Sequence, residues 1–419
     1  MNVLVLGSGG AGRQDAICWA LHKSMGVDDR LYVAPGNPGT ARWATNLEVN
    51  PLDNVAVLKL VRDRDYEINL VVVGPEAPLE NGVVDYLNEH APDVLVFGPT
   101  QAAARLETSK REAIEIMAIA KVPHPASEFF ENPEAVKTYV AAHPGKTFVI
   151  KADYLAQGKG VHIGETPDKA KEAAEHIKKG NLQRSIVVQE FLTGIEVSVF
   201  GFVDRRNVSR LIAACDYKKL HGKNTGGMGA YARASFWTRR LEAYVRQYIM
   251  LPIVREMEGR GTPYCGVLYA GLMILPDGTV KVLEFNCRLG DPEAQVILPR
   301  FRGNFLRTLV SCANGDLLTV PMSWKRRGVT VGVVIASEGY PDAPKIDRLI
   351  DGIEEAEKLG CIVFHGATER TNAGIVTTGG RPLTVVADAL TVEQARELAY
   401  KACSKIQLKG KQTIDSVGL

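Results

Sequence analysis

Four short apolar runs in the first hundred residues, each ending in a glycine or proline turn, constrain the fold more than any other feature of this sequence. The runs are residues 3–6, 30–34, 70–73 and 94–97, and the turns follow at Gly7, Pro35, Gly74 and Gly98. Apolar runs that alternate with helical patterns are typical of βαβ units. They predict an α/β region with a doubly wound parallel sheet, in which ligands bind beyond the carboxyl ends of the strands. We therefore expect the turns to surround a binding site.

A different pattern begins after residue 99. Ser109 and Glu112 have capping-box spacing and predict a helix, before a linker marked by Pro123 and Pro125. Residues 122–188 predict a small α/β lid, and residues 189–322 predict longer antiparallel strands with helices. The polar stretch at 324–327 predicts a boundary before a β-rich segment. We expect α/β and α+β domains, divided as residues 1–103, residues 104–322 with the lid, and residues 327–419.

The composition excludes several classes of protein. With 50 Lys and Arg against 48 Asp and Glu among 419 residues, the formal net charge of +2 argues against a nucleic acid as partner. No apolar run approaches the ~18 residues of a membrane span, and the first residues enter a strand pattern without a targeting segment. Seven scattered cysteines without a CxxC pair predict reduced thiols, not a disulfide framework or zinc site. We expect a cytoplasmic, globular, multi-domain protein of enzyme size.

The first glycine turn, Gly7 to Gly12, matches GxGxxG between a strand and a helix. A dinucleotide site of this type also needs an acidic residue at the end of the second strand, where this sequence has Ala34 and Pro35. The glycines still create a helix N-terminus that can bind a phosphate, and Arg13 adds a positive charge. Phosphate binding is favoured, with a merely tight turn and an NAD site as the alternatives.

Two lysines stand where an ATP site needs cations. Lys151 ends a strand pattern and precedes a glycine-bearing loop that can fold over a triphosphate, because glycine permits close backbone approach. Lys110 lies in the first turn of its helix, where a cation opposes the helix dipole unless an anion is near. The alternative for each lysine is a solvated surface charge, but together they favour a nucleotide site.

Glu284 and Asn286 occupy alternate positions of a strand, so their side chains leave the same face. A carboxylate and an amide oxygen suit Mg²⁺ that also carries phosphates and waters. Arg288 follows at once, and a guanidinium there can stabilise charge on a transferring phosphoryl group. The alternative is a salt-bridged edge strand. The small residues at 224–229 can present amides to a carboxylate, and the alternative there is an ordinary turn.

Eight short segments, in order along the whole chain, form a pattern more specific than any one motif. They are residues 34–40, 73–79, 97–100, 149–153, 189–192, 224–231, 268–273 and 284–293. Together they resemble the phosphoribosylamine–glycine ligase (glycinamide ribonucleotide synthetase) family of ATP-grasp enzymes in purine synthesis. The resemblance implies an N-terminal substrate-binding domain with a parallel sheet, a central ATP-grasp domain that carries the lid, and a small, β-rich C-terminal domain.

The resemblance implies an ATP-dependent carboxylate–amine ligase that acts on small molecules. ATP would phosphorylate the carboxylate of glycine, and the amine of 5-phosphoribosylamine would attack the resulting glycyl phosphate, giving glycinamide ribonucleotide, ADP and phosphate. The lid would shield the acyl phosphate from water. Mg²⁺, or Mn²⁺ in its place, would be the metal, and the protein would be a monomer or a homodimer.

The resemblance also assigns residues to each part of the site. Those implied for ATP are Lys110, Lys151, Lys159, the hinge residues Glu190, Phe191 and Leu192 beside adenine, and Glu196 on the ribose. Glu284 and Asn286 would bind the metal, and Arg288 and Lys151 would be catalytic. The turns implied for the ribose phosphate carry Gly9, Arg13, Asn37, Gly39, Thr40, Glu76, Ala77 and Pro78. The other substrate residues, besides Arg288, are Lys218, Asn224, Thr225, Gly226, Gly227, Met228, Asp291, Pro292 and Glu293.

Several positions depart from the family's usual sequence, although the ATP and metal positions are retained. Ala11 and Gly12 are inserted in the first loop, where Gln14 and Asp15 replace Glu and His. The other departures are Tyr154 and Gln157 in the phosphate loop, a shortened stretch at 216–224 with Tyr217 in place of His, and the inverted order of Gly366 and Ala367. The alternative hypotheses are a related ATP-grasp ligase that joins a different amine or amino acid in a specialised pathway, and a nucleotide-binding protein without catalysis.

Overall fold

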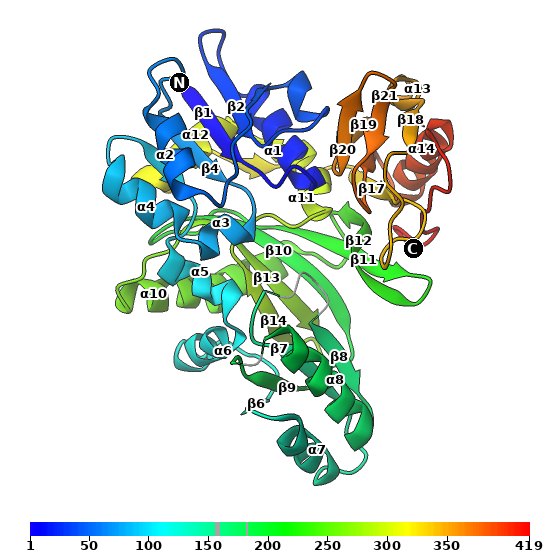
Figure 1. Cartoon of the computed structure of the whole chain (residues 1–419). Helices are drawn as coiled ribbons and strands as arrows, with labels where there is room; N and C mark the ends of the chain where they lie inside the picture. The colour runs from blue at the N-terminus through cyan, green and yellow to red at the C-terminus, as the bar shows by residue number, and fades with distance from the viewer. Residues whose placement is uncertain (156–159, 182) are drawn as a thin grey trace.

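The chain has four regions arranged around one long sheet. The structure is a computed structural model that describes residues 1–155, 160–181 and 183–419. The N-terminal region lies at the upper left of Figure 1, the C-terminal region at the upper right and the lid at the bottom. The central strands run between these three regions.

The N-terminal region is the predicted parallel sheet, with strand order β3-β2-β1-β4-β5. Its strands are β1 (Asn2–Leu6), β2 (Arg30–Ala34), β3 (Thr45–Asn46), β4 (Leu70–Val73) and β5 (Leu95–Phe97). Its helices are α1 (Gly12–His22), α2 (Asn54–Arg62), α3 (Glu76–Glu80) and α4 (Val83–His90), with a 3₁₀ turn at Thr40–Arg42. Residues 3–6 are completely buried, as the continuous apolar run requires. The strand order reverses between β1 and β4, which creates a topological switch point there.

Two helices lead from this sheet toward the lid, α5 (Gln101–Thr108) and α6 (Lys110–Ile119). The predicted cap is present, because the Ser109 hydroxyl accepts a hydrogen bond from the Glu112 amide at 3.3 Å. The Glu112 carboxylate does not complete a capping box, since it pairs with Arg105. The cap therefore consists of the serine alone, and it places Lys110 at the start of α6.

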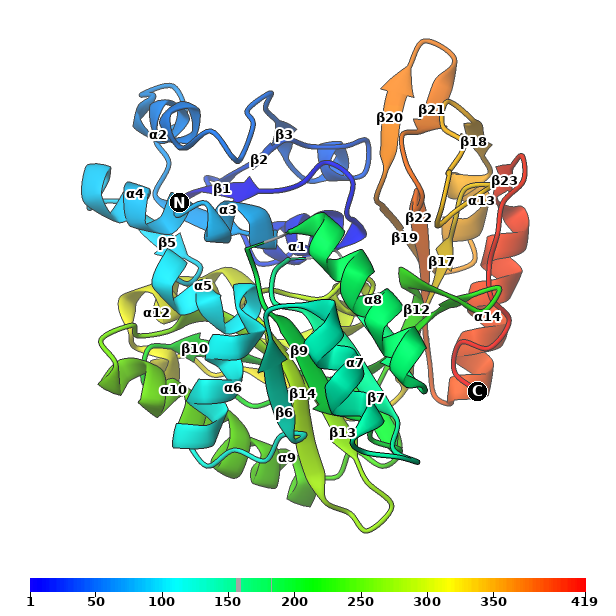
Figure 2. The ribbon, with the colours of Figure 1, turned by 60° about the horizontal axis from the view of Figure 1, so that its bottom comes forward.

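The lid is a four-stranded antiparallel sheet with order β6-β9-β7-β8. Its elements are β6 (Ser127–Phe130), α7 (Pro133–Ala141), β7 (Phe148–Ala152), β8 (Val161–Gly164), α8 (Pro167–Gly180) and β9 (Ile186–Glu190). The two helices lie side by side and cover one face of this sheet (Figure 2). Residues 156–159 of the loop between β7 and β8, which include Lys159 and Gln157, lie outside the described residues.

One sheet of eight strands joins the central and C-terminal regions, in the order β14-β13-β10-β11-β12-β17-β22-β19. Its central strands are β10 (Ile195–Asp204), β11 (Ile212–Leu220), β12 (Lys223–Ala232), β13 (Cys265–Ile274) and β14 (Val280–Asn286). Its C-terminal strands are β17 (Val329–Ile335), β19 (Ile362–His365) and β22 (Leu383–Ala389). Because β12 and β17 pair antiparallel, the C-terminal region extends the central sheet.

The remaining elements pack around this sheet. In the central region they are α9 (Arg239–Val245), a π-helical turn (Arg246–Met250), α10 (Leu251–Gly259), α11 (Glu293–Ile297), α12 (Phe305–Asn314), β15 (Phe301–Arg302), β16 (Ser323–Trp324) and 3₁₀ turns at Leu298–Arg300 and Leu317–Thr319. In the C-terminal region they are β18 (Leu349–Asp351), α13 (Ile353–Glu357), β20 (Thr368–Thr371), β21 (Gly374–Thr377), α14 (Val392–Lys405) and β23 (Gln407–Leu408).

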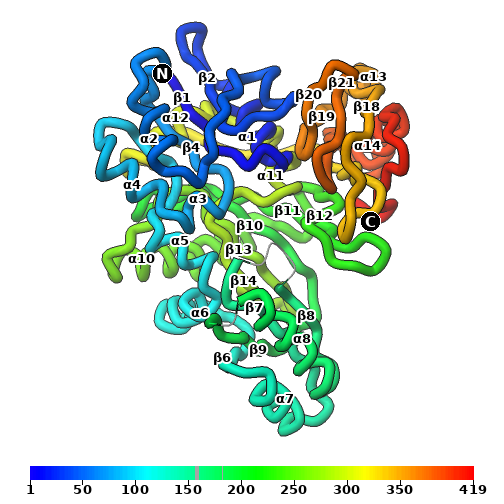
Figure 3. The backbone as a smooth tube through the Cα atoms, in the orientation of Figure 1, coloured from blue at the N-terminus to red at the C-terminus, as the bar shows by residue number. Residues whose placement is uncertain are grey.

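The end of the chain returns to the central sheet, beside the hairpin of β11 and β12 (Figure 3). The Tyr217 hydroxyl donates a hydrogen bond to the Leu419 carbonyl at 3.1 Å. Among the described residues, no helix combines the length and the apolar character that a membrane crossing requires.

Candidate active site

A crevice of about 500 Å³ opens at the switch point of the N-terminal sheet. It is lined by Gly7, Ser8, Pro35, Pro75, Ala77, Pro78 and residues 48–52. Three of the four predicted turns, those after β1, β2 and β4, therefore meet at one cavity, as expected for the carboxyl ends of a doubly wound sheet. The fourth turn, at Gly98, faces a different cavity. No motif marks residues 48–52 as lining residues, and the fold alone brings them here.

The Gln14 side chain occupies the amides of the first glycine turn. Its Oε1 accepts hydrogen bonds from the Ser8 amide at 2.9 Å and from the Gly9 amide at 3.0 Å. Its Nε2 donates to the Pro35 carbonyl. A Cβ atom at Gly7 would lie 2.1 Å from the end of the Gln14 side chain, so a larger residue there would displace Gln14 from these amides. A phosphate at this turn would have to use later amides of the loop or displace Gln14.

Two arginines and two glutamates from distant parts of the chain form one cluster beside this crevice. The Arg13 guanidinium donates to Glu76 at 2.6 Å and to the Leu289 carbonyl at 3.2 Å. Arg288 donates to the same Glu76 oxygen at 3.3 Å and pairs with Glu107 at 2.9 Å. The sequence predicted three of these side chains as site residues and missed Glu107, which carries no motif on its helix.

Burial and charge act in opposite directions on the two glutamates. Burial favours the neutral form of Glu76, but Arg13 and Arg288 outweigh it and hold the pKa of that carboxyl well below its usual range. Burial raises the pKa of Glu107, despite the attraction of Arg288 and a hydrogen bond from the Cys287 amide at 2.7 Å. The two glutamates of the cluster hold the Arg288 guanidinium from two sides.

Glu284 lies at the centre of a group of cations. It is opposite Gly271 in β13, where the register steps to Leu272 and Val282 and leaves Leu283 in a β-bulge. Burial opposes its ionisation, but Lys151, Lys110, Lys218 and Arg288 together lower the pKa of the Glu284 carboxyl. Lys218 and Arg288 also pair with other acids, so the cations of this group that suit a polyanion are Lys110 and Lys151.

Lys151 interacts with the charge of this carboxylate, and Asn286 lies two positions further along the same strand. The Lys151 ammonium is buried and donates to the carbonyl of the bulged residue Leu283 at 3.2 Å. Burial lowers the pKa of Lys151 to about 8, although the charge of Glu284 opposes this shift. The Asn286 Oδ1 atom accepts a hydrogen bond from Arg288 at 3.1 Å. Arg288 thus contacts the predicted metal ligand on one side and the crevice cluster on the other.

The predicted hinge lies where the lid meets the central sheet. Glu190 pairs with Lys281 of β14 at 2.9 Å, and its amide donates to the Ala126 carbonyl at 2.9 Å. The Phe191 ring, which follows, is exposed, and Leu192 is half-buried. Further along, Glu196 is exposed and pairs with Lys218 at 2.7 Å.

Lys218 also contacts a buried acid, Asp216, at 3.3 Å. Burial raises the pKa of Asp216 to about 7, since the nearby Lys218 offsets only part of the cost. Behind it, the buried Tyr269 hydroxyl hydrogen-bonds to Ser198 at 2.7 Å and to Glu293 at 3.1 Å. The structure therefore brings Glu196, Lys218 and Glu293 to one wall of the site.

The segment predicted as a substrate loop, residues 224–228, is part of strand β12. The shortened stretch before it closes as a two-residue hairpin turn, with positive φ at His221 (49°) and Gly222 (79°). The register then steps from Lys219–Asn224 to Tyr217–Gly229, so Thr225 to Met228 bulge opposite Lys218. The Gly226 amide donates to the Tyr340 hydroxyl at 3.0 Å and the Gly227 amide to Thr225 Oγ1 at 3.1 Å. These two amides are satisfied within the chain.

The departures at the first loop and at Gly366 meet at the contact between the N-terminal and C-terminal regions. The buried Asp15 carboxylate accepts hydrogen bonds from Trp43 at 2.9 Å and from the His365 amide at 2.8 Å, and Arg42 lies at 3.2 Å. Burial raises the pKa of Asp15 to about 6, against the attraction of Arg42. A Cβ atom at Gly366 would lie 2.4 Å from the Arg381 carbonyl and 3.3 Å from the Gly10 carbonyl of the first loop. The first loop and the segment at 365–366 thus lie against each other.

The predicted substrate residues Asn37, Gly39 and Thr40 lie at the same contact. The Asn37 side-chain Nδ2 donates to the carbonyls of His365 and Gly366 at 3.1 and 3.2 Å, and Thr40 is completely buried. None of these three residues, all within the described range 1–155, lines the 500 Å³ crevice. Their contacts are structural in this state of the protein.

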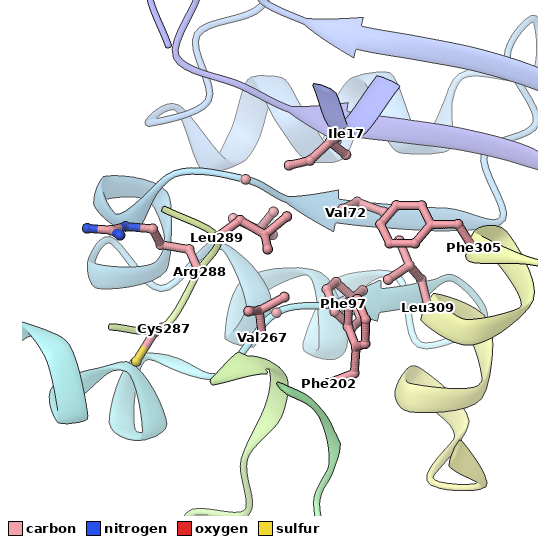
Figure 4. Close-up of a pocket in the computed structure, with 13 residues that line it drawn as sticks. Ile17, Val72, Phe97, Phe202, Val267, Cys287, Arg288, Leu289, Phe305 and Leu309 are labelled. Carbon is pink, nitrogen blue, oxygen red and sulfur yellow. The ribbon is translucent and has the colours of Figure 1, made fainter. Parts of the chain in front are cut away.

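A second cavity lies between the N-terminal sheet and the central strands (Figure 4). Its volume is about 20 Å³, enough for roughly one water molecule, and its lining is mostly apolar. The Arg288 side chain turns away from the apolar residues that fill this region in Figure 4. This cavity is a packing gap.

Comparisons with known proteins agree along the whole chain. Family models described as the N domain, the ATP-grasp (A) domain and the C domain of phosphoribosylglycinamide synthetase match residues 1–107, 108–294 and 330–418. The phosphoribosylamine–glycine ligase of Ralstonia nicotianae is 41% identical, with 100% of this chain and 99% of the relative covered. That of Yersinia pestis is 40% identical, with 98% and 96% covered.

Solved structures agree with this result. The crystal structure of phosphoribosylamine–glycine ligase from Thermotoga maritima has a TM-score of 0.81 and 31% identity, with 99% of each chain covered. Biotin carboxylase from Campylobacter jejuni, at 12% identity and a TM-score of 0.71, shares the fold alone. The chain is an ATP-dependent ligase with the ATP-grasp fold, and it belongs to the phosphoribosylamine–glycine ligase family.

Proposed function

We propose that this chain joins glycine to 5-phosphoribosylamine through glycyl phosphate, giving glycinamide ribonucleotide, ADP and phosphate, in the de novo synthesis of purines. One observation carries the proposal. The Arg288 guanidinium contacts Asn286, on the side of Glu284, and it contacts Glu76, on the side of the switch-point crevice. A ligase must bring a nucleotide phosphate and an amine together, and Arg288 lies where the two halves of the site meet.

The nucleotide half of the site would bind ATP through three kinds of contact. Lys110 and Lys151, with Lys159, supply positive charge for the phosphates. The exposed ring of Phe191, between Glu190 and Leu192, offers a surface on which adenine can pack. Glu196 would accept hydrogen bonds from the ribose hydroxyls, which requires its ion pair with Lys218 to open.

Glu284 and Asn286 would hold Mg²⁺, with Mn²⁺ as a substitute. Both side chains offer oxygen ligands, and the lowered pKa keeps the Glu284 carboxylate ionised. Within the described ranges, no three His, Cys, Asp or Glu side chains gather into a metal-binding cluster, so nucleotide phosphates would complete the coordination. When bound, the metal neutralises phosphate charge.

The chemistry would proceed in two steps. An oxygen of the glycine carboxylate attacks the γ-phosphorus, the bond to the bridging oxygen breaks, and ADP leaves. The amine nitrogen of phosphoribosylamine then attacks the acyl carbon, the carbon–oxygen bond to phosphate breaks, and the nitrogen loses a proton. Arg288 and Lys151 would stabilise the charge on the phosphoryl group in flight, since both are held within the site by protein contacts.

The crevice at the switch point would receive the ribose phosphate. Gly9, Arg13, Glu76, Ala77 and Pro78 lie at or beside its wall, in the place where α/β sheets bind ligands. Asn37, Gly39 and Thr40 would support this wall from the contact with the C-terminal region. Lys218, Asn224 to Met228 and Asp291 to Glu293 would surround the amino acid.

A ligase for a different amine or amino acid is the second candidate. The departures at 11–15 and 366–367 do not favour it, because they pack against each other between two regions of the chain. The shortened stretch before Asn224 does favour it, because this stretch borders the proposed amino-acid site.

The test of the proposed function is phosphate release from ATP and Mg²⁺, with glycine and freshly generated phosphoribosylamine, each omitted in turn. We expect glycinamide ribonucleotide, detected by mass, only in the complete mixture. Turnover that requires a different amino acid or amine would replace the proposal with the second candidate. Absence of ATP binding would refute both.

We further propose the division into domains at residues 1–103, 104–322 and 327–419, with the last continuing the central sheet. The chain would act in the cytoplasm, as its seven unpaired, buried thiols suggest. It would be a monomer or a homodimer, which sedimentation at several concentrations would distinguish.

The depressed pKa of Lys151 predicts a pH-dependent affinity for ATP. Because the free lysine titrates near pH 8, part of the population is neutral above that pH, and a bound polyphosphate favours the ammonium form. We expect ATP affinity to fall as the pH rises from 7 to 9, with proton uptake on binding. Titration calorimetry at pH 8.5 in two buffers of different ionisation enthalpy measures this uptake. A binding heat that is independent of the buffer would contradict the prediction.

The same shift predicts a change in the stability of the free protein. The folded pKa lies below the ordinary lysine value of 10.5, so the unfolded chain binds the additional proton between about pH 8 and 10.5. The contribution of Lys151 to the free energy of unfolding therefore rises with pH across this window. Lys151→Met should remove the effect.

A further inference from the structure

Arg381, which no motif marked, connects two segments of the proposed amino-acid site. Its guanidinium donates to the carbonyls of Gly226 at 2.7 Å and Gly227 at 3.3 Å. It also donates to the Asp291 carbonyl at 2.9 Å and pairs with the Asp291 carboxylate at 3.2 Å. Arg381, from the C-terminal region, thus connects the bulge of β12 with the turn that follows β14.

The sheet register explains why Arg381 reaches this place. Gly229 in β12 is paired with Val333 in β17, and Val333 is paired with Val385 in β22. Continuing this register brings residue 227 of β12 to the level of residue 383 of β22. Arg381 precedes the first residue of β22 by two positions. Because β12, β17 and β22 are neighbours in one sheet, the sheet itself places the Arg381 side chain beside the bulge of β12.

The two segments that Arg381 holds touch each other closely. Gly227 has a φ of 118°, and a Cβ atom there would lie 2.5 Å from the Pro292 ring. The Tyr340 hydroxyl, also from the C-terminal region, accepts a hydrogen bond from the Gly226 amide at 3.0 Å. Within the hairpin, the Thr225 hydroxyl donates to the Lys218 carbonyl at 2.8 Å, which links the bulge to Lys218. The contacts of Arg381 and Tyr340 therefore bear on the position of the bulge relative to the turn at 291–293.

We propose that Arg381 is a positioning residue for the amino-acid substrate, through which the C-terminal region completes the site. The proposal rests on the proposed function, since it assumes that the bulge and the turn at 291–293 surround the amino acid. A planar guanidinium can satisfy acceptors on both segments at once, whereas a lysine ammonium at the same position cannot span them equally.

The test compares the kinetics of Arg381→Ala and Arg381→Lys with those of the full-length wild type. We expect the KM for glycine to rise about 10- to 100-fold in Arg381→Ala, the loss expected for one charge-assisted hydrogen bond, with the KM for ATP nearly unchanged. Arg381→Lys should lie between, and millimolar guanidinium should restore part of the glycine affinity of Arg381→Ala. Arg370→Ala, which removes an exposed arginine of the same region, is the matched control.

Hydrogen exchange supplies a readout that does not depend on the substrate. We expect faster exchange in residues 223–229 of Arg381→Ala and unchanged exchange in the lid. An unchanged KM for glycine in both variants, or an equal rise of both KM values, would overturn the proposal. If Arg381→Ala does not fold, Arg381→Lys decides the question. Failure of the wild type to use glycine would instead refute the proposed function, so the two failures are distinguishable.

Discussion

Glu284→Gln should lower kcat at least about 100-fold, because replacing even an outer-shell partner of a metal ligand costs about 10- to 100-fold. The substitution preserves shape and removes one negative charge from a site where Lys110, Lys151, Lys218 and Arg288 surround the carboxylate. Magnesium affinity should fall in parallel, since a neutral amide oxygen is a weaker ligand than a carboxylate. Steady-state kinetics across a range of Mg²⁺ concentrations measure both changes.

Thermal unfolding gives an independent reading of the same variant. Ligand binding to the native state alone stabilises it by about 2.7 kcal/mol at a ligand concentration 100 times Kd. We expect the wild type to gain this stabilisation with Mg²⁺ and ATP together, and Glu284→Gln to lose the part that depends on Mg²⁺. Glu354→Gln, an exposed acid on α13, serves as the control. Full magnesium-dependent turnover in Glu284→Gln would show that the metal is held elsewhere.

Arg300→Ala should produce the largest loss of stability, about 3–5 kcal/mol in the free energy of unfolding, as expected when one partner of a buried ionic network is removed. The Arg300 side chain is 1% exposed and pairs with Asp388 at 3.2 Å. It also donates at 2.9 Å to Thr330 and to the carbonyls of Lys325, Arg327 and Gly328. These carbonyls belong to the junction before β17, so one side chain holds the junction in place.

Urea-induced unfolding followed by circular dichroism measures this loss. Arg326→Ala is the matched control, because that side chain is exposed and its removal should change stability by less than about 0.5 kcal/mol. A loss below about 1 kcal/mol in Arg300→Ala would mean that water replaces the buried contacts, and it would contradict the view of the junction as a rigid connection.

The shortened hairpin shows where sequence reasoning about loops fails. The small residues at 224–229 indicated a loop whose amides could bind a carboxylate, and the structure instead contains a bulge in β12 with the amides of Gly226 and Gly227 already bonded. The partner of the first amide is Tyr340, more than a hundred residues away. A composition of small residues predicts backbone freedom, but it does not reveal which side chains arrive from elsewhere.

The Gln14 side chain shows the same limit of sequence reasoning at the first glycine turn. The GxGxxG pattern predicted free amides, and Gln14 Oε1 accepts hydrogen bonds from two of them, at Ser8 and Gly9. Here the partner is only six residues from Ser8, so the signal was present in the sequence. A side chain on the first turn of the helix can reach back to the preceding loop, and this competition was missed.

Local features of this protein follow from the order of its residues. Periodicity and capping rules apply to features that depend on neighbours within a few positions. Such features are the buried strands β1 and β4, the Ser109 cap, and the placement of Glu284 and Asn286 on one face of a strand. The site as a whole does not follow in this way. Arg288 meets Glu76 across 212 positions, the Cys287 amide meets Glu107 across 180, and Arg381 meets Gly226 across 155. Such contacts depend on strand register and on how the sheets pack, and no local pattern records either.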